Sequence, residues 1–524
     1  MAVLVVMRGA RRTVVLPWQA MLAAGSFALL LIQEYLYLGF TIDDAFISFR
    51  YARNLALGHG LLFNLGEHVE GYTNFLWTVL MALPALLGAD RFPFGMLLVA
   101  KGLGVILSVG TILLLWQMGR RYRSASNSAM GPITAAAPWA LAASGAFAAW
   151  SVSGLETPLV TFLLVLAGYC LLRAERAPWW GGCFVLAALT RPEPLLLFGL
   201  VLLYRTGGRL RRRALAGLGS DALACVLFAL PYGSFLLWRL RYYGNLLPNT
   251  YYAKVGEVTS HGLTALAGAW YVLSGLLVLG LGGLCLVAMI PLLARRTSPH
   301  YRLVLLLFAA QVGIAVYEGG DWMPGYRFLV PTLPWLALLF QDGCMTLCPP
   351  RQWGSLLRGT VITIACLSAV LGGQLTINHE VPGVGTPMAP TSLVDPNYYA
   401  VARWMQANVP SADLVALGEA GIIPYYANVR VLDMFGLMDT HLAHLPGGPF
   451  DKFDVTYVLG RKPQYVLLAH VVHEPTGALS SIHFYARALW ADPRFAQQYA
   501  PVREFADNPD AGTSFVLYAR RPAR

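Results

Sequence analysis

Charged residues are scarce in this chain: Asp, Glu, Lys and Arg make up 12% of its 524 residues, whereas 57% are hydrophobic. A soluble protein carries about 25% charged residues. The scarcity argues against an ordinary soluble enzyme. Many stretches reach the roughly 20 apolar residues that cross a bilayer, so the sequence predicts a polytopic α-helical membrane protein. The net charge of +11 is explained by membrane topology, and no nucleic-acid partner is expected.

Cysteine is also sparse, and the C-terminal part has none. The seven cysteines lie in or between apolar segments, at Cys170, Cys183, Cys225, Cys285, Cys344, Cys348 and Cys366. A disulfide framework after Cys366 is therefore excluded. Cys344 and Cys348 lack the second Cys/His pair of a zinc site, so a structural role is predicted. The N-terminus has Arg8, Arg11 and Arg12 but no convincing cleavage site, which favours an uncleaved first helix.

Long apolar runs, by contrast, are abundant. Two of them, 179–190 and 193–204, are short and can form one broken or tilted unit, so the predicted count of about eleven carries a margin of two. The candidate spans are 19–38, 94–118, 132–150, 157–173, 179–190, 193–204, 221–238, 265–293, 303–318, 327–343 and 357–375.

The positions of arginine clusters indicate how these spans are oriented in the membrane. Under the eleven-span arrangement they all fall on one face, which the positive-inside rule assigns to the cytoplasm. The clusters are Arg8, Arg11 and Arg12; Arg120, Arg121 and Arg123; Arg173 and Arg176; Arg205, Arg209 and Arg211–Arg213; Arg295, Arg296 and Arg302; and Arg351 and Arg358. The N-terminus is therefore predicted inside, and the chain after about residue 376 outside.

The opposite ends of the spans carry acids and bases together. These residues are Asp43, Asp44, Glu67, Glu70, Glu156, Arg191, Glu193, Lys254, Glu318, Asp321 and Arg327. Charged groups beside hydrocarbon are costly and usually functional. The asymmetry predicts an extracytoplasmic active site.

The first outer loop, residues 39–93, begins with Asp43 and Asp44. Thr41 is a good N-cap with Asp44 at the third helical position, so the acids can simply cap an amphipathic interfacial helix. Alternatively, one of them is a general base, with a divalent cation as a possible aid. Asp44 is the more natural cap, which makes Asp43 the better base. No other cofactor is expected.

The segment 318–328, EGGDWMPGYRF, is the second candidate. Gly319, Gly320 and Gly325 allow tight turning. The remaining side chains combine an acid, aromatic faces and a base, which suits a sugar phosphate; they are Asp321, Trp322, Tyr326 and Arg327. The alternative is a plain helix-to-helix turn.

Three further loops contribute polar residues to the same face. Lys254 ends YGNLLPNTYYAK and can hold a phosphate. Arg191 can bind phosphate or simply pair with Glu193. The supporting or acceptor-binding candidates are Glu70, Tyr72, Asn74, Glu156 and Glu193, with helix capping as the alternative for Glu70.

Beyond the last span the composition becomes that of a globular domain. Prolines and glycines mark a linker over 376–396, which separates the membrane part, 1–375, from residues 397–524. Short apolar runs within 413–417, 429–434, 464–469 and 513–519 predict strands, and 397–408 and 482–492 predict helices. The alternation indicates a small extracytoplasmic α/β domain.

The ordered motifs DDAFISFRYARNLALGHGLLFN, VEGYTNFLW, SGLE, TRPE, LLPNTYYAK and GGDWMPGYRFLVP resemble the GT-C glycosyltransferases. The likeness extends to GEAGIIPYYANVRVLDMFGLMD in the tail and is greatest to the arabinofuranosyltransferase-like branch, which includes terminal arabinosyltransferases of mycobacterial cell walls and pilin arabinosyltransferases. The resemblance implies the GT-C fold. It also implies that Asp43 or Asp44 belongs to a catalytic acidic pair and that Asp321 and Arg327 match the GGD…R loop. Trp322 and Pro324 replace a different aromatic and a histidine of the mycobacterial branch, which leaves the acceptor open.

The implied function is inverting transfer of a single sugar, arabinofuranose by family inference, from a decaprenyl- or undecaprenyl-phosphate donor. The acceptor is a cell-envelope glycan or protein outside a bacterial plasma (inner) membrane, with the C-terminal domain in the periplasm. A lipid-linked sugar flippase or transporter is one rival, against which the chain shows no obvious internal repeat. An oligosaccharide ligase is another, and a third treats the tail as a carbohydrate-binding module.

Overall fold

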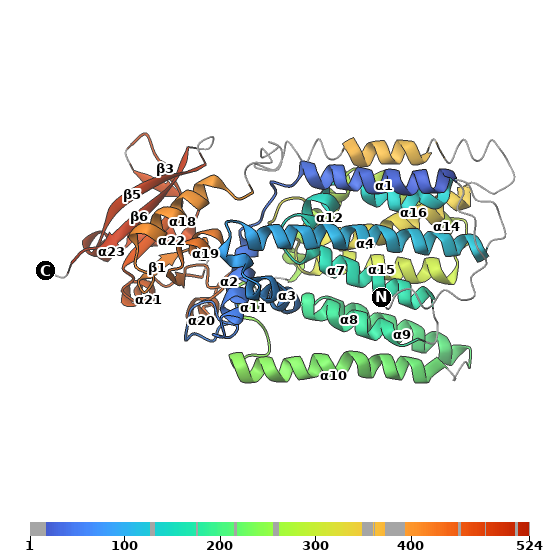
Figure 1. Ribbon diagram of the computed structural model, residues 1–524, viewed down its shortest axis with the longest axis horizontal. Coiled ribbons are helices and arrows are strands. Elements are labelled where there is room, and N and C mark those ends of the chain that lie inside the picture. Colours follow the sequence, from blue (N-terminus) through green and yellow to red (C-terminus); the bar gives the residue numbers. More distant parts are fainter. Residues whose placement is uncertain are drawn as a thin grey trace.

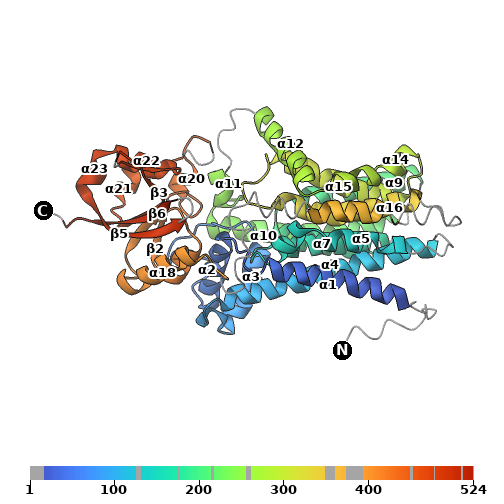
Figure 2. The same ribbon diagram turned by 90° about the horizontal axis from the view of Figure 1, so that it is seen from above.

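The computed structural model describes residues 17–125, 132–173, 177–213, 217–254, 261–347, 360, 362–372, 393–448, 452–476, 478–508 and 512–522. Long helices run side by side and form a helical body, and a domain containing a β-sheet lies at one end of them (Figure 1). A quarter turn of the view shows the same division (Figure 2). The short helices α2 (Asp44–Ala56), α3 (Phe75–Leu86) and α11 (Asn249–Lys254) lie between the two parts.

Each predicted span contains helix, but the lengths differ from the prediction. Within the described residues, five helices are long and apolar enough to cross a membrane, or up to seven if each of two bent pairs counts as one span. The helices of the body are α1 (Pro17–Leu36), α4 (Gly95–Ala125), α5 (Ala136–Ala142), α6 (Gly145–Ser151), α7 (Thr157–Arg173), α8 (Trp179–Thr190), α9 (Pro194–Arg211), α10 (Leu218–Tyr243), α12 (His261–Val278), α13 (Gly282–Ala288), α14 (Ile290–Leu293), α15 (Pro299–Tyr317) and α16 (Leu333–Leu347), with a further helix at Ile362–Gly372.

Glycines let the helices of the body approach closely. A Cβ on Gly104 of α4 would lie 1.8 Å from the carbonyl oxygen of Ser151, and one on Gly181 of α8 would lie 2.2 Å from that of Ala224 on α10. Small residues serve this purpose between membrane helices, where close van der Waals packing drives association. The helix backbones therefore pack closely at these glycines, and large side chains such as Trp150 and Trp335 are buried within the body.

The helix that follows Asp43 differs from the prediction in two respects. It begins at Asp44 with Asp43 as its N-cap residue, and the Thr41 hydroxyl instead donates to the carbonyl of Leu393 at 2.8 Å, so the predicted Thr41 cap is wrong. Nine of its 13 residues are buried, including Arg50. An amphipathic helix lying in the membrane interface would leave a polar face in water; α2 is instead enclosed by protein.

The C-terminal domain (residues 393–522) has the predicted α/β character. The sheet order is β2-β1-β3-β6-β5, with β4 beside β3. Strands β1 (Leu414–Leu417), β2 (Arg430–Asp433) and β3 (Tyr465–His473) are parallel neighbours, whereas β4 (Leu479–Ser481), β5 (Tyr499–Asn508) and β6 (Thr513–Arg520) join antiparallel. The helices are α18 (Pro396–Asn408), α19 (Ile422–Ala427), α20 (Thr440–Ala443), α21 (Val455–Gly460), α22 (Phe484–Ala491) and α23 (Pro493–Gln498). The predicted linker lies outside the described residues up to position 392.

The first outer loop and the C-terminal domain share one hydrophobic core. Ile47 and Tyr51 of α2 pack in the same cluster as Val415 and Leu417 of β1 and Ile423 of α19. Arg50 fastens this contact, because its guanidinium donates to the carbonyls of Phe63, Pro424 and Val429 at 2.7–2.9 Å. The domain is therefore built onto the loop that carries the two aspartates.

Candidate functional site

The two adjacent aspartates have different partners. The Asp43 carboxylate accepts hydrogen bonds from the backbone N–H groups of Gly421 (2.9 Å) and Ile422 (2.7 Å), at the start of α19. Burial raises the pKa of Asp43 to about 7, while the hydrogen bond from Ile422 opposes that rise. A Cβ on Gly421 would lie 2.1 Å from the Asp43 carbonyl oxygen, so this close approach requires glycine. Asp43 thus joins the first outer loop to the C-terminal domain.

Asp44 belongs to a group of charges that we name the charged cluster: Asp44, Glu156, Lys254, Asp321 and Arg327. Burial raises the pKa of Asp44 above its usual range, and the charges of Lys254 and Arg327 partly counter that effect. Partial desolvation lowers the pKa of Lys254, and the charge of Asp44 acts in the opposite direction. The residue as a whole is exposed, so it keeps access to solvent. Asp44 thus interacts electrostatically with the cluster, whereas the Asp43 carboxylate is held by the backbone of Gly421 and Ile422; the sequence had favoured Asp43 as the base.

The segment 318–328 supplies two members of the cluster through tight turns. Gly319, Gly320 and Gly325 have φ of 82°, 86° and 72°, a region that favours glycine. Arg327 begins the short 3-10 helix η4 (Arg327–Thr332), and its Nε lies 2.6 Å from Asp321 Oδ2. The chain therefore reverses direction between α15 and η4, and this reversal brings Asp321 and Arg327 together as an ion pair.

The two aromatic candidates in this segment have separate surroundings. Tyr326 packs its ring 5.2 Å from that of Tyr271 on α12. Trp322 is 65% exposed, so its indole face is accessible at the surface. A stacking role for Trp322 on a sugar remains a prediction, while Tyr326 has a packing partner within the protein.

A hydrogen-bonded network continues from the cluster to α2. Arg191 Nη1 lies 3.0 Å from Glu156 Oε1, and the guanidinium also binds Glu193, as the simple pairing predicted for these two residues requires. Asn74 donates to Glu156 at 2.9 Å and accepts from Ser48 of α2 at 3.1 Å. Burial opposes the ionisation of Glu156, but Arg191 and Arg327 outweigh it and hold its pKa below the usual range. Glu156 thus links two arginines.

A cavity that is partly open to solvent adjoins this network, and residues of α7, α9, α15 and η4 line it. Its walls are largely apolar, and its charged lining residues are Arg191, Arg327, Glu193 and Glu318. Apolar walls with a few polar groups are typical of ligand pockets. The apolar lining residues include Val160, Leu164, Leu197, Ile314 and Phe328. The cavity therefore places an apolar surface beside two arginines that pair with carboxylates.

Two residues predicted to support an acceptor lie elsewhere. Glu70 forms a buried ion pair with Arg239 of α10, with Oε2 2.9 Å from Nε, and the Tyr72 hydroxyl lies 3.1 Å from that of Tyr243. Burial raises the pKa of Glu70 to about 7, and Arg239 lowers it. Both side chains fasten the first outer loop to α10. The structure gives both residues partners on α10, and a role toward the acceptor stays a prediction.

The sequence suggested that Asp43 and Asp44 together bind a divalent cation, but the two carboxylates have different partners in the structure. Both Asp43 oxygens accept backbone hydrogen bonds, and the two carboxylates serve separate surroundings. Sequence reasoning missed Gly421 and Ile422 as partners of Asp43. Their segment was noted only as part of a resemblance, because nothing in the sequence reveals a contact across 378 residues.

Two curated relatives can be compared with the chain. It is 30% identical over 346 residues to the terminal beta-(1->2)-arabinofuranosyltransferase of Mycobacterium tuberculosis, an alignment covering 57% of this chain and 53% of that protein. It is 28% identical over 376 residues to the enzyme of the same name from Corynebacterium glutamicum, covering 62% and 50%. The chain thus spans about half the length of the curated relatives it matches. Residues 391–518 match a family described as a domain of unknown function, DUF8728.

Solved structures show the same fold. ArnT from Cupriavidus metallidurans bound to undecaprenyl phosphate superposes with a TM-score of 0.60 at 12% identity, covering 95% of this chain and 98% of that one. The archaeal oligosaccharyltransferase AglB from Archaeoglobus fulgidus, in complex with an inhibitory peptide and a dolichol-phosphate, superposes with a TM-score of 0.53 at 11% identity, covering 93% and 80%. The chain has the GT-C fold, and the predicted resemblance is confirmed.

Proposed function

We propose that this GT-C-fold relative of the terminal arabinofuranosyltransferases transfers one sugar from a polyprenyl-phosphate donor to a cell-envelope acceptor. The observation that carries the proposal is the apolar cavity lined by Arg191 and Arg327, since Arg327 also belongs to the charged cluster around Asp44. Apolar walls suit the polyprenyl chain, and guanidinium groups suit the phosphate. The structural neighbour ArnT was crystallised with undecaprenyl phosphate, which supports a lipid of this class.

The reaction is a single displacement at the anomeric carbon. The Asp44 carboxylate takes the proton of an acceptor hydroxyl, whose oxygen forms a bond to the anomeric carbon. The bond from that carbon to the phosphate oxygen breaks, and its electron pair leaves with the lipid phosphate. Lys254 and Arg327 stabilise the negative charge that develops there. Attack opposite the leaving group inverts the anomeric configuration.

Arabinofuranose is the proposed sugar because both curated relatives carry arabinofuranosyltransferase names. The acceptor is a glycan or protein of the envelope, and the lipid is of the decaprenyl or undecaprenyl type. The arginine distribution supports a cytoplasmic N-terminus and a C-terminal domain outside a bacterial plasma membrane.

The decisive assay offers the purified full-length protein a panel of polyprenyl-phosphate pentoses and hexoses with envelope glycan acceptors. We expect polyprenyl-phosphate arabinofuranose to be consumed and one sugar to be added per acceptor. Addition of a preformed oligosaccharide would identify a ligase. Movement of the lipid across a vesicle membrane without transfer would identify a flippase, and either result would overturn the proposal.

Replacing Lys254 by Met should lower kcat/KM for the donor by about 10- to 100-fold, because one charge-assisted contact to phosphate is lost. The measurement is the initial transfer rate against donor concentration. Arg403 on the exposed face of α18 is a matched control, and R403M should leave the rate unchanged. Equal rates for K254M and the wild type would remove Lys254 from the phosphate site.

The same variant tests the base through pH. Asp44 must be ionised to accept a proton, so the rate falls as the pH drops through the Asp44 pKa. Burial raises this pKa above 3.8, which places the acidic limb of the profile above pH 3.8. Lys254 lowers the Asp44 pKa, and K254M should therefore shift the limb to higher pH. If the acidic limb of the K254M profile stayed at the wild-type pH, it would contradict an interaction between Lys254 and Asp44.

A further inference from the structure

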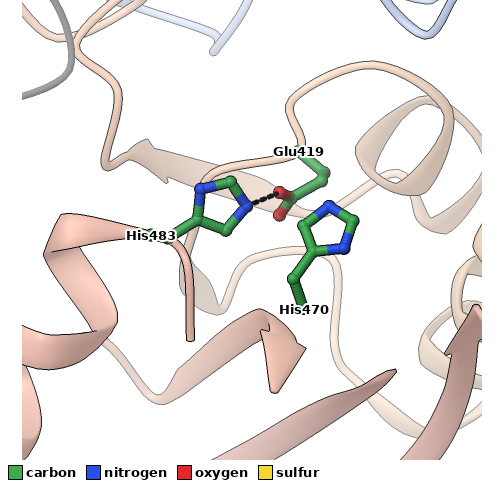
Figure 3. A group of neighbouring side chains, drawn as sticks. All are labelled: Glu419, His470 and His483. Atoms are coloured by element: carbon green, nitrogen blue, oxygen red, sulfur yellow. Dashed lines mark ion pairs between the residues drawn. The ribbon is translucent and has the colours of Figure 1, made fainter. Parts of the chain in front are cut away.

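Three side chains of types that commonly bind metals meet inside the C-terminal domain, and none of them belongs to the charged cluster. Glu419 lies in the loop between β1 and α19, His470 lies on β3, and His483 is the N-cap residue of α22. The side chains of these residues converge from three separate segments (Figure 3). Among the described residues, their ligand atoms alone form a group of three or more that all lie within 4.8 Å of one another.

The distance between Glu419 and His483 fits a shared ion better than a hydrogen bond. Glu419 Oε1 lies 3.4 Å from His483 Nε2, whereas a good hydrogen bond between such atoms is about 2.7–3.2 Å. Two ligands at about 2.0–2.1 Å from a tetrahedral ion are separated by about 3.3 Å. Glu419 is 8% exposed, and its Oε2 has no hydrogen-bond partner among the described residues. His483 Nε2 likewise makes no hydrogen bond within the described part of the chain.

The backbone of β3 is deformed where it presents His470. The pairing of β3 with β6 shifts register between Leu468 and Val471, and His470 has φ of 49°, a left-handed conformation that is uncommon for a residue other than glycine. Bulges of this kind re-aim side chains and are frequent beside functional sites. In Figure 3 the His470 ring lies beside the Glu419 carboxylate.

Neighbouring groups hold the second histidine in place. The Tyr485 ring stacks on His483 at 5.0 Å with an interplanar angle of 11°, and its hydroxyl lies 3.4 Å from Glu419 Oε1. The Ser481 hydroxyl accepts from the backbone N–H of His483 and donates to the carbonyl of Ala469, beside His470. Outer contacts that fix ligand orientation are typical of metal centres.

We propose that Glu419, His470 and His483 bind a divalent transition-metal ion, with Zn²⁺ the best match to two imidazoles and one carboxylate. Three protein ligands leave a fourth position for water. The site is separate from the Asp43–Asp44 pair for which the sequence suggested a cation, and it does not depend on the transfer reaction.

The ion has a defined structural consequence. Glu419 lies two residues before Gly421, whose backbone N–H holds Asp43. Metal binding at Glu419 therefore fixes the loop that joins the C-terminal domain to the first outer loop. Glu419 also acts electrostatically on Asp43, so the two places are close neighbours.

The test uses full-length protein in detergent, with any histidine tag removed and metal stripped by a chelator. Titration with Zn²⁺ should show one equivalent bound per chain and a rise in the midpoint of thermal unfolding. H470N and H483N should each weaken Zn²⁺ binding at least tenfold and abolish that rise. H473N is the matched control, because His473 lies on the same strand but pairs with exposed Glu504.

A second measurement keeps the proposal testable if the histidine variants do not fold. Co²⁺ added to the stripped wild type should give the strong visible absorption of a four-coordinate ion, and one equivalent of Zn²⁺ should remove it. Absence of stoichiometric Zn²⁺ binding to the wild type would overturn the proposal. So would unchanged affinity in folded H470N and H483N.

Discussion

Replacement of Asp44 by Asn is expected to lower the transfer rate by about 100- to 10,000-fold, the usual contribution of a general base. The amide keeps the shape of the side chain and cannot take the proton of the acceptor. Asp44 interacts with Lys254 and Arg327, which we place at the leaving phosphate. Initial rates with the preferred polyprenyl-phosphate sugar provide the measurement, and thermal unfolding checks that the variant is folded.

The matched variant is Asp43→Asn. Its side chain retains one oxygen for the N–H of Ile422 or Gly421 but turns an amide nitrogen toward the other donor. We therefore expect D43N to lower the midpoint of thermal unfolding and to reduce the rate less than D44N does. Full activity of D44N together with an inactive, folded D43N would restore the sequence-based assignment of Asp43 as the base.

Replacement of Arg50 by Met is expected to reduce the free energy of unfolding by at least about 3 kcal/mol, because three hydrogen bonds from a buried charged group are lost. Those bonds reach Phe63 in the first outer loop and Pro424 and Val429 in the C-terminal domain. The thermal midpoint of the purified protein in detergent should fall. Limited proteolysis should release the C-terminal domain sooner than in the wild type.

Arg53 provides the control, because it lies one turn further along α2 and contacts the same segment. Its guanidinium binds the Tyr425 carbonyl at 3.1 Å and the exposed Asn428 side chain at 2.9 Å. Partly exposed contacts contribute little, so R53M should change the midpoint only slightly. Equal losses for R50M and R53M would show that burial of Arg50 does not govern the contact.

Local patterns predicted much of the fold. The apolar runs of the helical body and the four short apolar runs of the C-terminal domain became helices and strands near the expected positions. Strand β5 was missed because YAPVREFADN is polar and contains Pro501. It lies at the edge of the sheet, where proline is tolerated and one side needs no partner.

The sequence indicated which charges lie at the outer helix ends, but not which of them meet. The charges of the outer helix ends were identified from their distribution, and the structure brings Asp44, Glu156, Lys254, Asp321 and Arg327 together. Which aspartate faces them depends on a contact with Gly421 and Ile422 that no local pattern encodes. Glu419, His470 and His483 escaped notice for the same reason, since 12 residues separate even the two histidines.

The enclosed position of α2 has a consequence for biosynthesis. Arg50 is made early, but its partner Pro424 follows 374 residues later. At about 5–20 residues per second, the ribosome needs about 20 to 75 s to supply that partner. During this interval the apolar and charged faces of α2 stand without their final cover. The last quarter of the chain thus completes a segment synthesised in the first tenth, and a ribosome that stalls between them leaves an exposed, unfinished helix for chaperones or proteases to recognise.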